Sequence, residues 1–126
     1  PLGRKDFAGN PLTQDQRRWN RDSGVLEKAP QLGSGGPTYG WLSAALKSIA
    51  VVRGMKSAKG LKCPVLIVAA GLDSVVDNDA IRRFSERVAG VSIITIREAM
   101  HEILLEKDEI RQQFLAAFDV FVAEEA

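Results

Sequence analysis

Cysteine is almost missing from this sequence, since Cys63 is the only one among 126 residues. A single thiol excludes a disulfide within the chain and is compatible with a reducing compartment, so we expect a cytoplasmic location. Neither sign of charge is in excess, because 17 lysine and arginine residues stand against 16 aspartate and glutamate residues. No basic tract indicates a nucleic acid partner, and no apolar run approaches the roughly 18 residues of a membrane span. We therefore expect a soluble protein of at most one domain that does not bind nucleic acid.

Two segments have the composition of β-strands, and a helical segment lies between them. Residues 64–70 form an apolar run with no polar face, which indicates a parallel strand covered on both sides. Residues 91–96 are β-branched almost throughout. Residues 79–89 carry apolar side chains at helical spacing, and Asn78 is available as their N-cap. This order predicts a parallel strand, helix, strand unit of the α/β class.

A residue whose side chain is capable of acid–base chemistry follows each strand of this unit. Asp73 comes directly after the first strand, and His101, the only histidine, comes shortly after the second. Taken singly, such an aspartate is often a turn residue and such a histidine is often structural. Parallel neighbouring strands lie about 4.8 Å apart and end at one edge, where open α/β sheets bind ligands. The sequence therefore predicts that the Asp73 carboxylate and the His101 imidazole can meet.

Three further helices are predicted from capping residues and helical periodicity. The first of these helices carries three arginines, Arg17, Arg18 and Arg21, which are interpreted as a solvated face rather than an anion site. Glu102 and Glu106 flank His101, and each either orients the imidazole or is exposed, as most carboxylates are. The predicted ranges are 13–22, with Thr13 and Gln16 as a capping box, 39–53 after Thr38, and 108–123 with Asp108 as N-cap.

No serine in the chain has the surroundings of an activated nucleophile. The pattern G-x-S-x-G is absent, and Ser34 has neither that spacing nor a preceding strand. The glycines around Ser34 also lack the Gly-Lys-Ser/Thr of a phosphate-binding loop, because Pro37 follows them. Two strands are too few for an independent sheet, and the chain does not begin with methionine. We therefore expect the C-terminal part of a larger α/β domain.

The order strand, Gly-x-Asp, helix, strand, histidine loop and final helix resembles the closing third of the α/β-hydrolase fold. Residues 64–78 and 98–106 are similar to the matching segments of the lysophospholipase and monoacylglycerol lipase branch, and residues 10–15 and 36–41 are similar to the cap region of its bacterial lysophospholipases. The resemblance implies the C-terminal portion of that fold, with parallel strands, flanking helices and a helical cap, incomplete without N-terminal strands. It implies a helical cap or lid and return helix over residues 1–56 and hydrolase core over residues 57–126.

The same resemblance implies a serine-type ester hydrolase in which Asp73 is the acid and His101 the general base of a catalytic triad. Asp77 is interpreted as a residue that starts the helix rather than as the acid. Cys63 does not replace the missing serine, since it lies at the opposite end of its strand. The resemblance implies a lysophospholipid or monoacylglycerol substrate, peripheral membrane contact as a possibility, and no metal or organic cofactor. This chain alone is expected to be inactive, with the N-terminal half of the domain as its missing partner.

Two alternatives remain open from the sequence. One is an inactive hydrolase-like fragment that acts as a binding or interaction module and keeps Asp73 and His101 as relics. The absence of the serine motif favours it, whereas the retention of both partners in matching loops weighs against it. The other is an unrelated doubly wound domain, which would need a glycine-rich phosphate turn that residues 71–73 do not form.

Overall fold

The computed structural model describes residues 6–54, 61 and 63–124. The predicted boundary between cap and core, at residues 56 and 57, lies outside the described residues, and that division stays a prediction. The elements in chain order are α1 (Gln16–Lys28), the short 3₁₀ helix η1 (Pro30–Leu32), α2 (Tyr39–Gly54), β1 (Val65–Ala70), α3 (Asn78–Arg87), β2 (Val91–Ile96), the short 3₁₀ helix η3 (Ile103–Leu105) and α4 (Asp108–Glu124).

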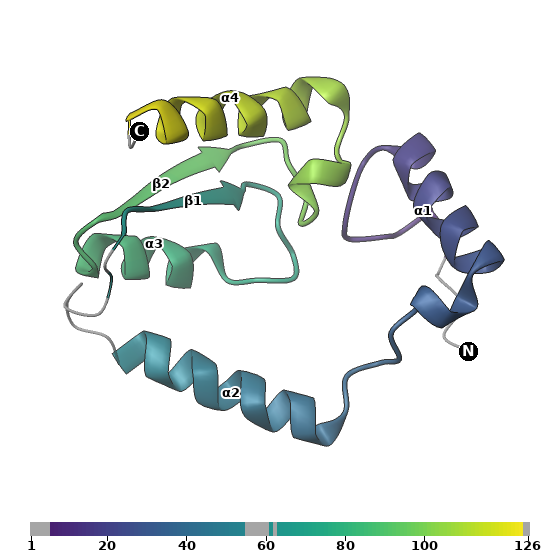
Figure 1. The fold of residues 1–126 in the computed structure, drawn as a ribbon, viewed down its shortest axis with the longest axis horizontal. Coiled ribbons are helices and arrows are strands. Elements are labelled where there is room, and N and C mark those ends of the chain that lie inside the picture. The colour runs from purple at the N-terminus through teal and green to yellow at the C-terminus, as the bar shows by residue number, and fades with distance from the viewer. Residues whose placement is uncertain (1–5, 55–60, 62, 125–126) are drawn as a thin grey trace.

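The two strands form a parallel pair between two helices. Val65 lies opposite Val91 and Ala70 lies opposite Ile96, so the strands are in register from end to end. Helix α4 packs over one face of the pair and α3 over the other (Figure 1). The predicted strand, helix, strand unit and the α/β class are confirmed. Both strands end at the same edge of the sheet, and the loops that carry the candidate residues leave from that edge.

The buried core lies at this carboxyl edge. Ala70 and Ile96, at the ends of the strands, pack with Ala99 and with Ile110 of α4, and all are at most 5% exposed. Gly71 follows β1 at a point where the chain passes against the backbone of Arg97. A Cβ atom at Gly71 would lie 2.4 Å from the Arg97 carbonyl oxygen, so only glycine fits there. The loop after β1 is thereby held against the loop after β2.

Helix α1 begins later and ends later than the predicted range 13–22. Asp15 is its N-cap, because its side chain accepts a hydrogen bond from the Arg18 N–H at 3.0 Å. Thr13 is not the cap. Its hydroxyl donates to the Leu105 carbonyl at 2.7 Å, so a contact with a distant segment replaces the local capping box.

The capping of α3 and α4 also differs from the prediction. Asp77, not Asn78, caps α3, and its side chain accepts from the Ala80 N–H at 3.0 Å. The amide of Asn78 donates instead to the Ala70 carbonyl at 2.8 Å, which ties the start of α3 to the end of β1. Asp108 lies in the first turn of α4 rather than at its cap, and its carboxylate accepts from Arg18.

Helix α2 matches its predicted range closely but has no buried residue. Thr38 accepts the Trp41 N–H at 3.1 Å, as expected of a cap. The side chains of Tyr39 and Trp41 are 94% and 61% exposed, and the apolar residues along the helix are exposed as well. In the described part of the chain, no helix is both long and apolar enough to cross a membrane.

Candidate active site

Asp73 lies in the turn after β1, and its carboxylate is almost completely enclosed. The side chain is 4% exposed. One oxygen, Oδ1, accepts the backbone N–H groups of Val75 at 2.8 Å and Val76 at 3.1 Å. The other, Oδ2, lies 2.8 Å from Nδ1 of His101, which is 28 residues further along the chain. The structure thus brings together the two residues that the sequence selected.

The electrostatics of Asp73 favour its ionised form. Burial alone would raise its pKa, but the hydrogen bond from His101 and those from the backbone N–H groups of Val75 and Val76 outweigh burial and hold the pKa below its ordinary value. An ionised carboxylate only accepts hydrogen bonds, so the proton between the two side chains belongs to Nδ1 of His101. Nε2 then carries the lone pair, and this is the tautomer that a general base requires.

Part of the His101 ring is accessible to solvent. Its side chain is 29% exposed, compared with 4% for Asp73. A buried carboxylate behind a partly exposed imidazole leaves Nε2 as the atom that a reacting group can approach. Asp77 does not take part in this pair, since it caps α3 and lies 3.4 Å from the guanidinium of Arg83.

The two glutamates that flank His101 have different environments. Glu102 is exposed, as expected. Glu106 is 0% exposed, so the expectation of a solvated carboxylate is wrong for this residue. Its carboxylate accepts the backbone N–H groups of Met100 at 2.9 Å and Gln14 at 3.1 Å rather than the imidazole of His101. No local sequence signal distinguishes Glu106 from Glu102, because one of its partners lies 92 residues away.

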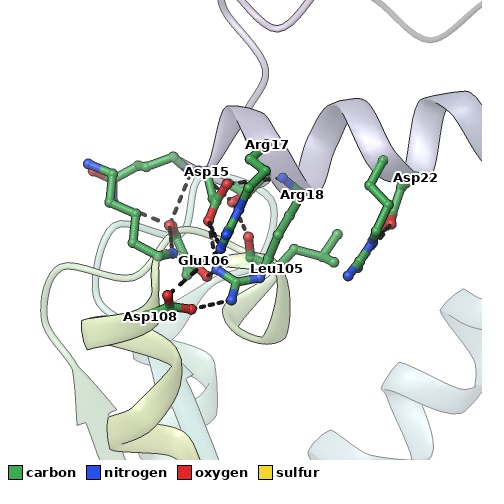
Figure 2. Close-up of polar contacts among 11 residues, drawn as sticks. Asp15, Arg17, Arg18, Asp22, Leu105, Glu106 and Asp108 are labelled. Carbon is green, nitrogen blue, oxygen red and sulfur yellow. Dashed lines mark hydrogen bonds and ion pairs between the residues drawn. The ribbon is translucent and has the colours of Figure 1, made fainter.

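Arg18 is likewise buried rather than part of a solvated face. It is 8% exposed, whereas the side chains of Arg17 and Arg21 are 74% and 65% exposed, as predicted. Figure 2 shows the Arg18 guanidinium reaching from α1 to the segment that joins η3 to α4. It donates to Asp15 at 2.6 Å, to the Glu106 carbonyl at 2.5 Å, and to Asp108. The start of α1 is thereby fixed beside the histidine loop.

The two nucleophiles considered from the sequence, Cys63 and Ser34, do not lie with the pair, and the described residues hold no cluster of metal ligands. Cys63 is exposed and precedes β1, at the end of the strand away from Asp73. Ser34 is exposed in the connection between η1 and α2. No group of histidine, cysteine, aspartate and glutamate side chains that could hold a metal ion occurs in residues 6–54, 61 and 63–124. The pair by itself can orient and transfer a proton.

Comparison with known proteins identifies the family. The family model for serine aminopeptidase S33 matches residues 6–108. The chain belongs to this family of α/β hydrolases, which confirms the fold that the sequence pattern implied.

Two relatives that are similar to this chain are named as lysophospholipases. The chain is 34% identical over 118 residues to lysophospholipase L2 of Escherichia coli strain K12, with 88% of this chain and 34% of the relative covered. It is 29% identical over 113 residues to the probable lysophospholipase L2 of Haemophilus influenzae, with 90% and 36% covered. The chain therefore spans about a third of the length of these relatives. No solved structure matches it significantly.

Proposed function

We propose that this chain carries the acid and the general base of a serine-type carboxylic ester hydrolase whose substrate is a lysophospholipid or a monoacylglycerol. The observation that carries the proposal is the 2.8 Å contact between His101 Nδ1 and the enclosed carboxylate of Asp73, at the carboxyl edge of a parallel strand pair. Membership of the S33 hydrolase family and the names of the two lysophospholipase relatives support it.

In this mechanism His101 Nε2 removes the proton of a serine hydroxyl as its oxygen attacks the ester carbonyl carbon. The imidazolium then gives that proton to the departing alcohol, and an acyl-enzyme remains. In the second half His101 Nε2 takes a proton from water as the water oxygen attacks the acyl carbon. The bond from that carbon to the serine oxygen then breaks, the imidazolium returns the proton to the serine oxygen, and the fatty acid leaves. Asp73 holds the imidazole in the Nδ1–H tautomer and stabilises its charged form. General base catalysis of this kind contributes about 10²- to 10⁴-fold in rate.

The serine and the oxyanion hole come from outside these 126 residues in this proposal, because the sequence has no G-x-S-x-G. The N-terminal half of the same domain is the proposed partner. An open apolar groove between the sheet and α4, lined by Leu66, Ile94, Val120 and Phe121, offers it a surface. A chain without that half would be inactive.

The apolar surface of α2 supports the proposed substrate class. Its exposed side chains include Trp41, Leu46 and Val51, at 61%, 58% and 69% exposure. With α1 and α2 as the cap, such a surface would contact an acyl chain or the surface of a lipid aggregate. A cytoplasmic enzyme with peripheral membrane contact fits this arrangement.

A second candidate function is an inactive hydrolase-like module that binds a partner. The absence of the serine motif from the chain and the exposed apolar residues of α2 favour it. It requires no proton transfer by His101. The two candidates therefore differ in whether a substitution at His101 changes a measured rate.

Expression of the whole reading frame that encodes this chain tests the proposal. The protein is assayed with a p-nitrophenyl butyrate ester, a lysophosphatidylcholine and a monoacylglycerol, and compared with its His101→Ala variant. We expect hydrolysis that falls by more than about 10³-fold in the variant. A folded protein that hydrolyses none of the three would contradict the proposal and support the binding module.

A further inference from the structure

We propose that Glu106 is a positioning residue for His101, and that residues 10–18 act with it as a brace for the histidine loop. The inference rests on the proposed hydrolase function and concerns groups that the proton-transfer mechanism does not use. It starts from a buried carboxylate that contacts neither the imidazole nor a metal. Such a group is costly to enclose unless hydrogen bonds compensate it, so the position of its donors is informative.

The donors to Glu106 connect the histidine loop to the segment before α1. Its Oε1 accepts the backbone N–H of Met100 at 2.9 Å, and its Oε2 accepts the backbone N–H of Gln14 at 3.1 Å. Met100 directly precedes His101, so the first of these bonds fixes the peptide unit next to the histidine. Because Glu106 is 0% exposed, its carboxylate depends on protein donors rather than on bulk water.

The other neighbour of His101 is held by the same segment. The backbone N–H of Glu102 donates to the carbonyl of Leu12 at 2.8 Å. Both peptide neighbours of His101 are therefore anchored, one through Glu106 to Gln14 and the other directly to Leu12. Neither anchor belongs to a helix or a strand ladder, so contacts with the segment before α1 help to fix the backbone on both sides of His101.

The brace itself is rigid because buried side chains hold its turns. Asn10 is 9% exposed, and its Oδ1 accepts the N–H groups of Leu12 at 2.9 Å and Thr13 at 3.0 Å. The hydroxyl of Thr13 donates to Leu105 at 2.7 Å. Arg18 donates to the Glu106 carbonyl at 2.5 Å and so attaches the first turn of α1 to the same point (Figure 2). A displacement of this segment would move the histidine loop with it.

The expected consequence is a loss of turnover without a loss of substrate binding. The His101 to Asp73 contact is 2.8 Å, and an error of about 1 Å in the position of a catalytic group costs roughly 10²-fold in rate. Glu106 is enclosed and touches no substrate, so its replacement should leave KM within about twofold. A role in folding alone would lower the amount of folded protein but not kcat per folded molecule.

The test uses the protein from the whole reading frame with p-nitrophenyl butyrate as substrate. The concentration of folded protein is measured by near-ultraviolet circular dichroism, and kcat is calculated per folded molecule. Glu106→Gln keeps one acceptor oxygen and loses the other, whereas Glu106→Leu loses both. Ile110→Val is the matched control, since it removes a methyl group from the core without touching the brace. We expect kcat to fall by about 10-fold in Glu106→Gln and about 100-fold in Glu106→Leu, with Ile110→Val unchanged. Unchanged kcat in both Glu106 variants would overturn the inference.

A variant further from His101 and an NMR measurement that does not depend on catalytic turnover complete the test. Asn10→Ala, which removes the acceptor at the centre of the brace, should lower kcat by about 5- to 10-fold even if Glu106→Leu fails to fold. The Nδ1 proton of His101, identified by its loss in His101→Gln, should shift or broaden in the proton NMR spectra of Glu106→Gln and Asn10→Ala but not of Ile110→Val. An inactive parent protein would refute the proposed function only, whereas an unmoved resonance in both brace variants would refute the positioning role.

Discussion

Replacing Arg18 by methionine is expected to destabilise the protein by about 3 kcal/mol, because it removes one partner from a buried ion pair. The side chains of Arg18 and Asp15 are both 10% exposed, and their closest atoms lie 2.6 Å apart. Removal of one member of such a pair costs roughly 3–5 kcal/mol. The lower end of this energy range applies here because the Asp15 carboxylate still accepts the hydrogen bond from the backbone N–H of residue 18, at 3.0 Å. The contact with Asp108 contributes little, since that carboxylate is 59% exposed and solvent screens it.

Urea denaturation of the protein from the whole reading frame measures this loss. Two double-mutant cycles, one combining Arg18→Met with Asp15→Asn and one combining it with Asp108→Asn, separate the energies of the two contacts. Asp15→Asn also changes the helix cap, but this effect cancels in the cycle between Arg18 and Asp15. We expect the larger coupling energy for Asp15. A loss below about 1 kcal/mol, or a coupling to Asp108 that equals or exceeds the coupling to Asp15, would refute the reasoning.

Two further predictions concern stability. Gly71→Ala should destabilise the protein by at least about 1–3 kcal/mol in urea denaturation. The added Cβ would lie 2.4 Å from the Arg97 carbonyl oxygen, which is backbone and cannot move aside. An unchanged denaturation midpoint would show that the loop after β1 does not contact the loop after β2. The lowered pKa of Asp73 contributes stability above the unfolded pKa of about 3.9, and this stability is lost as the pH falls through the folded pKa. The melting temperature should therefore fall below about pH 5, and it should fall less in Asp73→Asn than in Asp119→Asn, a variant of an exposed aspartate on α4.

The strands and the meeting of Asp73 with His101 could be predicted because local patterns determine them. The apolar run before Gly71 and the β-branched run before residue 97 each identify a strand without reference to the rest of the chain. A helix between two such strands requires a parallel pair, and a parallel pair places both following loops at one edge. The contact at 2.8 Å agrees with the prediction that the two side chains can meet at this edge.

The brace could not be predicted because its partners are far apart in the sequence. Thr13 satisfies the local rule for a helix cap, but its hydroxyl bonds Leu105, 92 residues away, and the cap moves to Asp15. Arg18 lies among exposed arginines and is buried by acceptors 88 and 90 residues away. Glu102 and Glu106 lie at the two ends of the same apolar segment, residues 103–105, but have opposite burial. Periodicity and capping rules describe neighbours along the chain and carry no information on such contacts.

We propose that Asp73 and His101 activate a serine for attack on a lipid ester. The most direct measurement is kcat/KM for lysophosphatidylcholine hydrolysis by the protein from the whole reading frame, with Asp73→Asn compared with Asp119→Asn. We expect kcat/KM to fall by about 10³- to 10⁴-fold in Asp73→Asn, because an amide cannot stabilise the imidazolium, and to stay unchanged in Asp119→Asn. Equal kcat/KM values in the two variants would contradict the account.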